Sequence, residues 1–442
     1  MAAPLQATSL SDVAAALPEG QWAELATSGF NPATLDDGAA SSVFWFAEDM
    51  GWDATRRQLL YVGGGHDSDA EFVRYSEVTN AWSRSKPSGG FWHANFSHAY
   101  DHIALIPSVG RLYFRQPASA ESDQIEIYDL AAGTWSRSPL MAQAPACCGA
   151  LEYFPDLGGL VLVAGDGPIY FYDPAANLWS TLASGAAIGD YHNFAEYSAA
   201  HRMMIFGGGE GPNGMTLFRL DANRQITRLN DAPQRMGTTH SVVTTDPVSG
   251  NFLVFFDTAS YELDPVTQAW TPLTTVPPWI ALGNAGVFNA VATPVPTYGI
   301  TLVAKYAGDD SRVYLYRHRA STAPPPTLTL TANPAAVGAG GFSVLSWSST
   351  DTAHCTGTGG INSWPGSKSV PNGSENVGPV QALTSFGLSC SGPGGAVQQS
   401  VTVDVQITVS GSSSGGGGGS LDLLALLGLI GVAVGRRRAS AF

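Results

Sequence analysis

Short apolar runs separated by turn residues recur along the first three quarters of the chain. Between residues 20 and 320, an apolar run that often ends in Gly is followed by a second run ending in Tyr or Leu, a turn, and a Trp. Short apolar runs bounded by Gly, Pro, Asn and Asp are typical of β-strands joined by tight turns. The pattern predicts an all-β protein built from one repeated unit.

The spacing between the aromatic residue and the Trp is nearly constant. Tyr75 precedes Trp82 by seven residues, and Leu220 precedes Ile226 by six in a degenerate copy. The seven-residue spacing recurs in Tyr128–Trp135, Tyr172–Trp179 and Leu263–Trp270. Asp-Pro favours the start of a turn, and Asn or Gly shortly before the Trp tolerates a left-handed backbone. Each copy therefore predicts a β-hairpin whose Trp covers the gap between neighbouring sheets.

The Gly run, the aromatic residue and the Trp at a fixed distance resemble Kelch repeats. The segments RQLLYVGGG and HRMMIFGGG match position for position. Residues 20–320 resemble Kelch-repeat β-propellers, such as the central domain of galactose oxidase. No residues match the copper centre of that enzyme, so the resemblance implies the fold and no cofactor.

The resemblance implies a closed ring of six blades. Six Trp-strand positions can be identified: Trp22, Trp82, Trp135, Trp179, Ile226 and Trp270. The last repeat, around Val313–Arg317, lacks a Trp strand, and we expect the isolated GQWAEL segment at Trp22 to supply it. This pairing would remove an exposed sheet edge. Seven blades are the alternative, if residues 23–58 contain a further one.

The remainder of the chain predicts a second, smaller domain. Residues 321–327 form a Pro-rich linker, and residues 328–409 contain alternating runs that resemble a bacterial Ig-like β-sandwich, with Trp347 in its core. Cys147 and Cys148 are adjacent, and neighbouring cysteines rarely bond to each other. We expect a disulfide between Cys355 and Cys390, which implies an oxidising compartment.

The C-terminus combines three unlike elements in a fixed order. A Gly/Ser tether (410–420) precedes a hydrophobic tail (421–442), predicted to form a short helix, that ends in three arginines. This order resembles the GlyGly-CTERM sorting tail, which implies cleavage by a rhombosortase-like protease; a plain tail anchor is the alternative. Both place the body outside the cytoplasm, at the outer surface or secreted, after transient membrane anchoring. Residues 1–20 lack the features of a signal peptide, so we expect either that the true start codon lies upstream or that the peptide has been removed.

The charge balance excludes one class of partner. The formal net charge is −15, with 36 acidic and 21 basic residues. Nucleic-acid binding requires a basic face that displaces counterions, and this composition provides none. We expect a monomer with an extracellular glycan or protein ligand.

Candidate site residues cluster where the repeats begin. Aligning the repeats places Tyr100, Cys148, His192 and His240 at equivalent positions, at one mouth of the propeller. His192, His240 and Tyr100 are the candidate catalytic residues, as acid and base. The other candidate ligand-binding residues are His66, Asp67, Trp92, His98, Asp101, His102, Asp190 and Tyr191. No spacing is diagnostic of a metal, although these side chains could hold one, and polar packing between blades is the structural alternative.

Three functions fit this sequence. The first is a surface-displayed binding or adhesion protein whose propeller mouth recognises glycan or protein. The second is a carbohydrate-active enzyme (a lyase, hydrolase or epimerase), which requires His192, His240 and Tyr100 to converge. The third is a structural surface-layer component.

Overall fold

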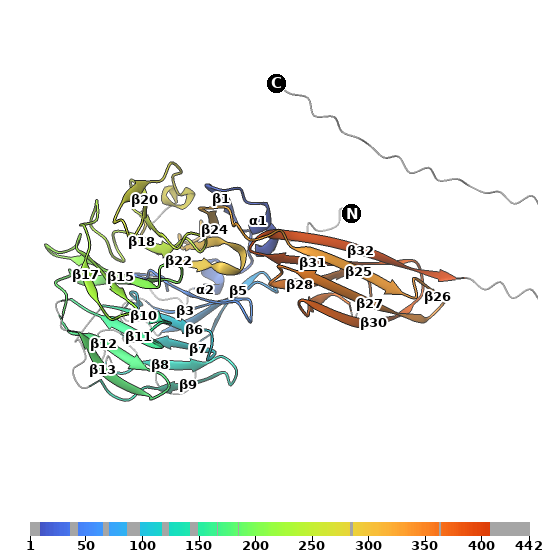
Figure 1. The fold of residues 1–442 in the computed structure, drawn as a ribbon, viewed down its shortest axis with the longest axis horizontal. Helices are drawn as coiled ribbons and strands as arrows, with labels where there is room; N and C mark the ends of the chain where they lie inside the picture. The colour runs from blue at the N-terminus through green and yellow to red at the C-terminus, as the bar shows by residue number, and fades with distance from the viewer. Residues whose placement is uncertain are drawn as a thin grey trace, which may run out of the picture.

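The regular elements of the described residues are nearly all β-strands (Figure 1). The computed structural model describes residues 9–35, 43–64, 70–85, 98–116, 123–141, 149–165, 167–183, 185–282, 286–361 and 364–406. Its helical segments are α1 (Leu10–Ala16), α2 (Pro32–Leu35), η1 (Pro278–Ala281) and η2 (Pro296–Tyr298). Within the described residues, none of these helices is long and apolar enough to cross a membrane.

The larger part of the molecule contains six four-stranded antiparallel sheets. The first three are β2 (Gly51–Asp53), β3 (Gln58–Gly63), β4 (Glu71–Ser76) and β5 (Ala81–Ser85); β6 (Ile103–Ile106), β7 (Arg111–Phe114), β8 (Glu126–Asp129) and β9 (Thr134–Arg137); and β10 (Ala150–Phe154), β11 (Gly159–Val163), β12 (Ile169–Asp173) and β13 (Leu178–Ala183). The next two are β14 (Asp190–Ser198), β15 (Met203–Glu210), β16 (Leu217–Asp221) and β17 (Ile226–Arg228); and β18 (Val242–Thr245), β19 (Phe252–Phe255), β20 (Ser260–Leu263) and β21 (Trp270–Pro272). The sixth is β22 (Ala290–Val295), β23 (Ile300–Lys305), β24 (Arg312–Arg317) and β1 (Gln21–Glu24).

The first strands of these sheets surround a common axis. Strand β2 contacts β6, β6 contacts β10, and the contacts continue through β14, β18 and β22 back to β2. Parallel bridges join Ala47 to Tyr100 and Asp101 to Ala150, so neighbouring inner strands run in the same direction. Repeated four-stranded sheets arranged in a circle define a β-propeller.

The ring is closed by a strand from the beginning of the chain. Strand β1 pairs with β24 with Trp22 opposite Tyr316, which confirms the predicted pairing. The Trp22 ring stacks on Tyr316 with centroids 4.5 Å apart and meets the edge of Phe255 at 5.5 Å. Sequence-distant segments therefore share one sheet, and no outer edge of β24 is left open along these four residues.

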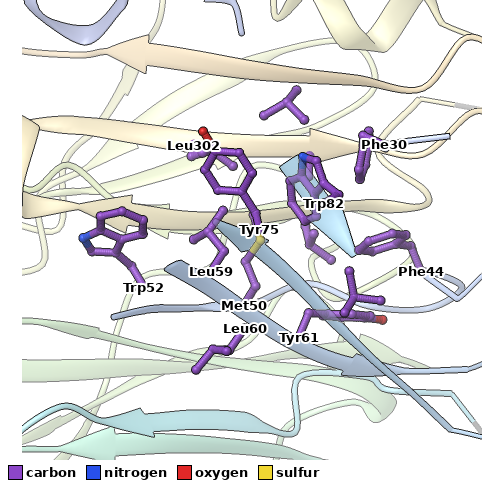
Figure 2. Close-up of a cluster of buried hydrophobic side chains, with 14 of the residues drawn as sticks. Phe30, Phe44, Met50, Trp52, Leu59, Leu60, Tyr61, Tyr75, Trp82 and Leu302 are labelled. Carbon is purple, nitrogen blue, oxygen red and sulfur yellow. The ribbon is translucent and has the colours of Figure 1, made fainter. Parts of the chain in front are cut away.

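The repeated aromatic–Trp motif forms the predicted hairpins. Tyr75 lies opposite Trp82 across β4 and β5, and the rings are 5.2 Å apart (Figure 2). Phe30 packs on the other side of Trp82, at 4.7 Å. The residue two positions before the Trp or its equivalent has a positive φ in all five copies: Asn80, Gly133, Asn177, Arg224 and Gln268. Asn or Gly accommodates this conformation without the strain that Arg224 and Gln268 carry.

The second part of the molecule contains two sheets that share one core. The three-stranded sheet has the order β25 (Thr327–Asn333), β27 (Gly341–Thr350), β30 (Asn372–Val380). The five-stranded sheet has the order β26 (Ala336–Gly338), β32 (Gly395–Gln406), β31 (Thr384–Gly392), β28 (His354–Gly359), β29 (Gly366–Lys368). Trp347, Cys355 and Cys390 belong to the same buried cluster.

The predicted disulfide between Cys355 and Cys390 is confirmed. It closes a loop with a sequence separation of 35 residues. By the chain-entropy estimate, a loop of this length stabilises the folded state by about 4 kcal/mol. We expect a Cys355→Ser/Cys390→Ser variant to lose about this much in urea unfolding followed by Trp fluorescence. A loss below about 1 kcal/mol would contradict the assignment of a stabilising role to the bond.

Buried polar contacts join the two parts. The Arg57 guanidinium pairs with Glu77 at 3.0 Å, and Tyr298 Oη donates to the same carboxylate at 2.7 Å. Arg57 also reaches Thr356 of the second part, and the Tyr298 ring lies 6.0 Å from that of His354. The ion pair lies within the first part, and the contacts of Arg57 with Thr356 and of Tyr298 with His354 favour one orientation of the two parts.

Candidate functional site

A cluster of polar side chains lies at the end of the ring where the inner strands begin. Strands β14 and β15 extend further here than the equivalent strands of the other sheets, and Asp190 lies opposite Glu210 at their ends. The backbone of Gly209 has a φ of 102°, and a Cβ there would lie 2.4 Å from the carbonyl oxygen of Tyr191. This close approach requires glycine. It brings Glu210, the next residue, beside His192.

Glu210 is the centre of this cluster. One of its oxygens, Oε1, accepts a hydrogen bond from His240 Nε2 at 2.9 Å and lies 3.3 Å from His192 Nδ1 and from Thr239 Oγ1. The other, Oε2, lies 3.4 Å from Arg235 Nη1. Two imidazoles, a hydroxyl and a guanidinium therefore converge on one carboxylate, which we call the Glu210 cluster. It is accessible to solvent, since the Glu210 side chain is 39% exposed.

An aromatic layer borders the Glu210 cluster. The rings of Phe46 and His192 are stacked 5.2 Å apart, and Tyr100 lies 5.4 Å from His192. His98 packs against Phe46 at 3.8 Å, and Phe288 meets Phe46 edge-on at 4.9 Å. Segments from several sheets thus supply flat apolar surfaces next to polar groups, which is typical of ligand sites.

Several residues of this region have a strained backbone. Phe46, Tyr100, Tyr191 and His192 all have φ between 49° and 51°. For bulky residues this left-handed region is uncommon and costs about 1 to 3 kcal/mol each. Such conformations concentrate at functional sites, where the surrounding structure maintains them.

The structure brings together some of the predicted site residues and separates others. His192 and His240 share Glu210, and Tyr100 lies beside His192. Tyr191 is 54% exposed at the edge of the cluster. Asp101 and His102 are buried, with Asp101 directed to the ring axis and His102 Nδ1 within 3.0 Å of the Arg115 carbonyl oxygen. His66, Asp67, Trp92, Cys147 and Cys148 lie outside the described residues.

Sequence reasoning missed Glu210. The sequence does contain a signal for it, because Glu210 follows Gly207–Gly209 just as the candidate His66 follows the matching triple Gly. Phe46 and Arg235 were missed as well. Neither lies in a repeat motif, so nothing in the sequence pattern placed them at this mouth.

The electrostatics of the Glu210 cluster suit acid–base chemistry or the binding of hydroxyl groups. Burial alone would raise the pKa of Glu210, but hydrogen bonds from His240 and His192 hold it below its usual value. Burial lowers the pKa of His192, and its bond to Glu210 offsets this only in part. His192 is therefore neutral at pH 7, with Nδ1–H donated to the carboxylate and Nε2 available as an acceptor. Among the described residues, no group of three or more His, Cys, Asp or Glu is placed to hold a metal ion.

A second group of acidic residues lies in the ring axis. Glu48, Asp49, Asp101, Glu152 and Glu196 come from the first four sheets or the segment entering them. Asp101 accepts a hydrogen bond from the Ala195 amide at 2.6 Å, and Glu48 accepts one from the Val243 amide at 2.9 Å. Burial raises the pKa of Asp101 to about 8. The carboxyl groups of Asp101 and Glu48 therefore link sheets that are not neighbours in the ring, which is a structural role.

Comparison with known proteins adds the following. No protein-family model matches the chain, and no curated protein matches it. A structural genomics protein of unknown function from Bacteroides thetaiotaomicron is similar over 67% of this chain and 75% of its own, with 13% identity and a TM-score of 0.47. The RRP9 WD40 repeats are similar over 62% of this chain and 94% of their own, with 9% identity and a TM-score of 0.41.

The extracellular domain of the putative one component system BT4673 from B. thetaiotaomicron is similar over 85% of this chain and 59% of its own, with 9% identity and a TM-score of 0.40. All three scores lie below 0.5. The class of this protein therefore rests on its own sheets: it is an all-β protein whose repeated four-stranded antiparallel sheets form a β-propeller.

Proposed function

We propose that this protein is an exported surface protein whose propeller binds a glycan at the Glu210 cluster. The observation that carries the proposal is the convergence of His192, His240 and Arg235 on one exposed carboxylate, beside a layer of aromatic rings. Sugar hydroxyls require both donors and acceptors, and the faces of sugar rings pack against aromatic rings. The Glu210 cluster supplies the donors and acceptors, and the adjacent aromatic layer supplies the rings, at one mouth of the propeller.

The proposal also includes the type of propeller, the nature of the second domain, the cellular compartment and the role of the tail. Six four-stranded sheets and the aromatic–Trp hairpins support a six-bladed Kelch-like propeller. Two sheets around a shared core support an Ig-like spacer, and the Cys355–Cys390 bond supports an oxidising compartment. The tail at 421–442 lies outside the described residues, and the sorting role proposed for it rests on its sequence.

A glycan array tests the binding site. We expect wild-type protein to bind a defined set of glycans and His240→Ala to weaken that binding at least about tenfold. The His240 imidazole holds the Glu210 carboxylate in place, and a sugar hydroxyl that donates to this charged group contributes about 1.5 to 3 kcal/mol. Glu24→Gln, a surface substitution in β1, is the matched control and keeps wild-type affinity. Failure of wild-type protein to bind any glycan, or full binding by His240→Ala, would exclude the site.

One observation favours a second function, acid–base catalysis on the bound glycan. The bond between His192 and Glu210 fixes the imidazole as a carboxylate does in hydrolase triads, and Tyr100 is a candidate acid beside it. On this alternative, mass spectrometry detects a product from an array-positive glycan, and both His192→Ala and Tyr100→Phe abolish its formation. Binding without any product leaves the first function alone.

A further inference from the structure

A group of exposed apolar side chains lies at the end of the second part that is remote from the propeller. Phe342, Val344 and Leu383 are 53%, 42% and 67% exposed, and they are three of the four large apolar side chains exposed among the described residues of this part. Figure 1 shows β26 and the end of β32 at this end, with the propeller at the other. We call this end the distal tip and define it as residues 333–344, 376–384 and 401–406.

The strand arrangement gathers these side chains in one place. Phe342 and Val344 occupy alternate positions of β27, on the face turned away from the buried core. The Gly340 amide donates to the Val380 carbonyl oxygen at 2.9 Å. This bond places the turn before β27 beside the segment that contains Leu383.

The described chain ends at this same tip. Gly338 of β26 pairs with Gln406 at the end of β32, and Gln406 is the last residue that the structure describes. The sequence continues with the Gly/Ser-rich segment 410–420 and the hydrophobic tail 421–442. Gly/Ser-rich chains of about 15 residues span about 20 Å on average. A tail held in a membrane would therefore keep the distal tip near the surface of the bilayer.

The distal tip carries almost no charge. Asp404 is the only charged residue in its three segments, whereas 13% of the whole chain is charged. The turn before β27 contains Gly338, Gly340 and Gly341, so few side chains keep the apolar groups away from a flat surface. Charged groups are costly to move toward hydrocarbon, and this tip has only one to desolvate. Without Lys or Arg it has no means of selecting anionic lipids, so the surface that it fits is a neutral bilayer.

We propose that the distal tip rests on a lipid bilayer, with Phe342, Val344 and Leu383 at the boundary between headgroups and acyl chains. Affinity for a bilayer scales with the apolar area buried, so three partly exposed side chains bind only weakly on their own. A covalent link to a membrane-held tail makes the contact intramolecular, and the resulting local concentration of lipid favours it. The proposal rests on the membrane role proposed for the tail and is independent of glycan binding at the Glu210 cluster.

Oxidative footprinting of the full-length chain on phosphatidylcholine vesicles tests this contact. A protease site placed within residues 410–420 allows the same protein to be measured while attached and after release. Hydroxyl radicals modify exposed aromatic and aliphatic side chains, and mass spectrometry locates the products. We expect oxidation of Phe342 to rise at least about threefold on release, because the bilayer no longer covers its ring. Tyr191 and Val276, which are exposed on the propeller, are the internal references and are expected to keep the same oxidation.

A charge placed at the tip separates lipid contact from other causes of protection. Leu383 is exposed, so Leu383→Asp adds a carboxylate without disturbing the core. We expect this variant to show the released level of Phe342 oxidation even while it is attached. Val276→Asp adds the same charge at an exposed apolar position of the propeller and is the matched control, expected to keep the protection of Phe342.

The possible failures can be told apart. A full-length chain that does not float with the vesicles excludes both the membrane role of the tail and the contact at the tip. Attachment with equal Phe342 oxidation before and after release overturns the contact and leaves the role of the tail standing. Protection of Phe342 in released protein that grows with protein concentration also overturns it, because a second copy of the chain would then cover the tip.

Discussion

A chain that begins at Leu25 is expected to lose the closed ring and to aggregate. The deletion removes β1, and with it the four-residue pairing of β1 with β24, so the edge of β24 becomes exposed. It also removes the carbonyl groups of Ala14 and Leu17, to which the buried Arg317 guanidinium donates at 2.7 and 2.8 Å. The buried guanidinium would keep only its bonds to the carbonyl groups of Tyr298 and Gly299. An exposed strand edge and the loss of hydrogen-bond acceptors from a buried cation are both unfavourable. We expect destabilisation of several kcal/mol, visible as a loss of soluble monomer in size-exclusion chromatography.

Two single substitutions distinguish the contribution of ring closure to stability from that of aromatic packing. Trp22→Ala removes the stack on Tyr316, and Trp179→Ala removes the equivalent ring from a sheet whose outer strand is held by a hairpin. Each is expected to cost about 2 to 4 kcal/mol in urea unfolding. Only Trp22→Ala is expected to increase hydrogen exchange throughout β24, because β1 has no hairpin to hold it. Equal exchange in the two variants would contradict the closing role of β1.

The stability of the propeller is expected to fall as the pH rises from 5 to 8. Burial raises the pKa of Asp101 to about 8, and burial with mutual repulsion raises those of Glu48, Asp49, Glu152 and Glu196. A carboxyl group with a raised folded-state pKa favours folding most at low pH. That contribution is lost as the pH rises through the folded-state value. Each proton lost on unfolding changes the free energy of unfolding by about 1.4 kcal/mol per pH unit.

The Asp101→Asn variant tests this origin of the pH dependence. The amide oxygen can still accept from the Ala195 amide, while the ionisable group is gone. We expect the decline in the free energy of unfolding between pH 5 and 8 to become shallower by up to about 1.4 kcal/mol per pH unit. Asp156→Asn is the control, because hydrogen bonds from Tyr197 and Arg202 lower the pKa of Asp156, which places its titration below this range. An unchanged slope in Asp101→Asn would contradict the assignment.

Much of the fold could be predicted because the repeat has a local physical cause. The hairpin between Tyr75 and Trp82 depends on a turn residue with positive φ and on two rings in register, all within eight residues. The pairing of Trp22 with β24 followed from a surplus strand at one end and a deficit at the other. The Cys355–Cys390 bond followed from two cysteines in one strand-rich module.

The candidate site was predicted only in part, since it depends on contacts between distant segments. His192 and His240 begin equivalent repeats, so their proximity was predictable from alignment. Glu210 ends a strand, and its role depends on glycine positions that let β15 approach Tyr191. The axial carboxylates face one another only after the ring has formed, and no local pattern distinguishes Glu152 from a surface glutamate.

Hydrogen–deuterium exchange with and without an array-positive glycan tests the central claim most directly. If the Glu210 cluster is the binding site, the glycan protects amides in residues 189–193, 208–211 and 235–241, and leaves those around Glu152 and Thr245 unchanged. Protection confined to the second part of the molecule, or to the opposite end of the ring, would contradict the proposed function.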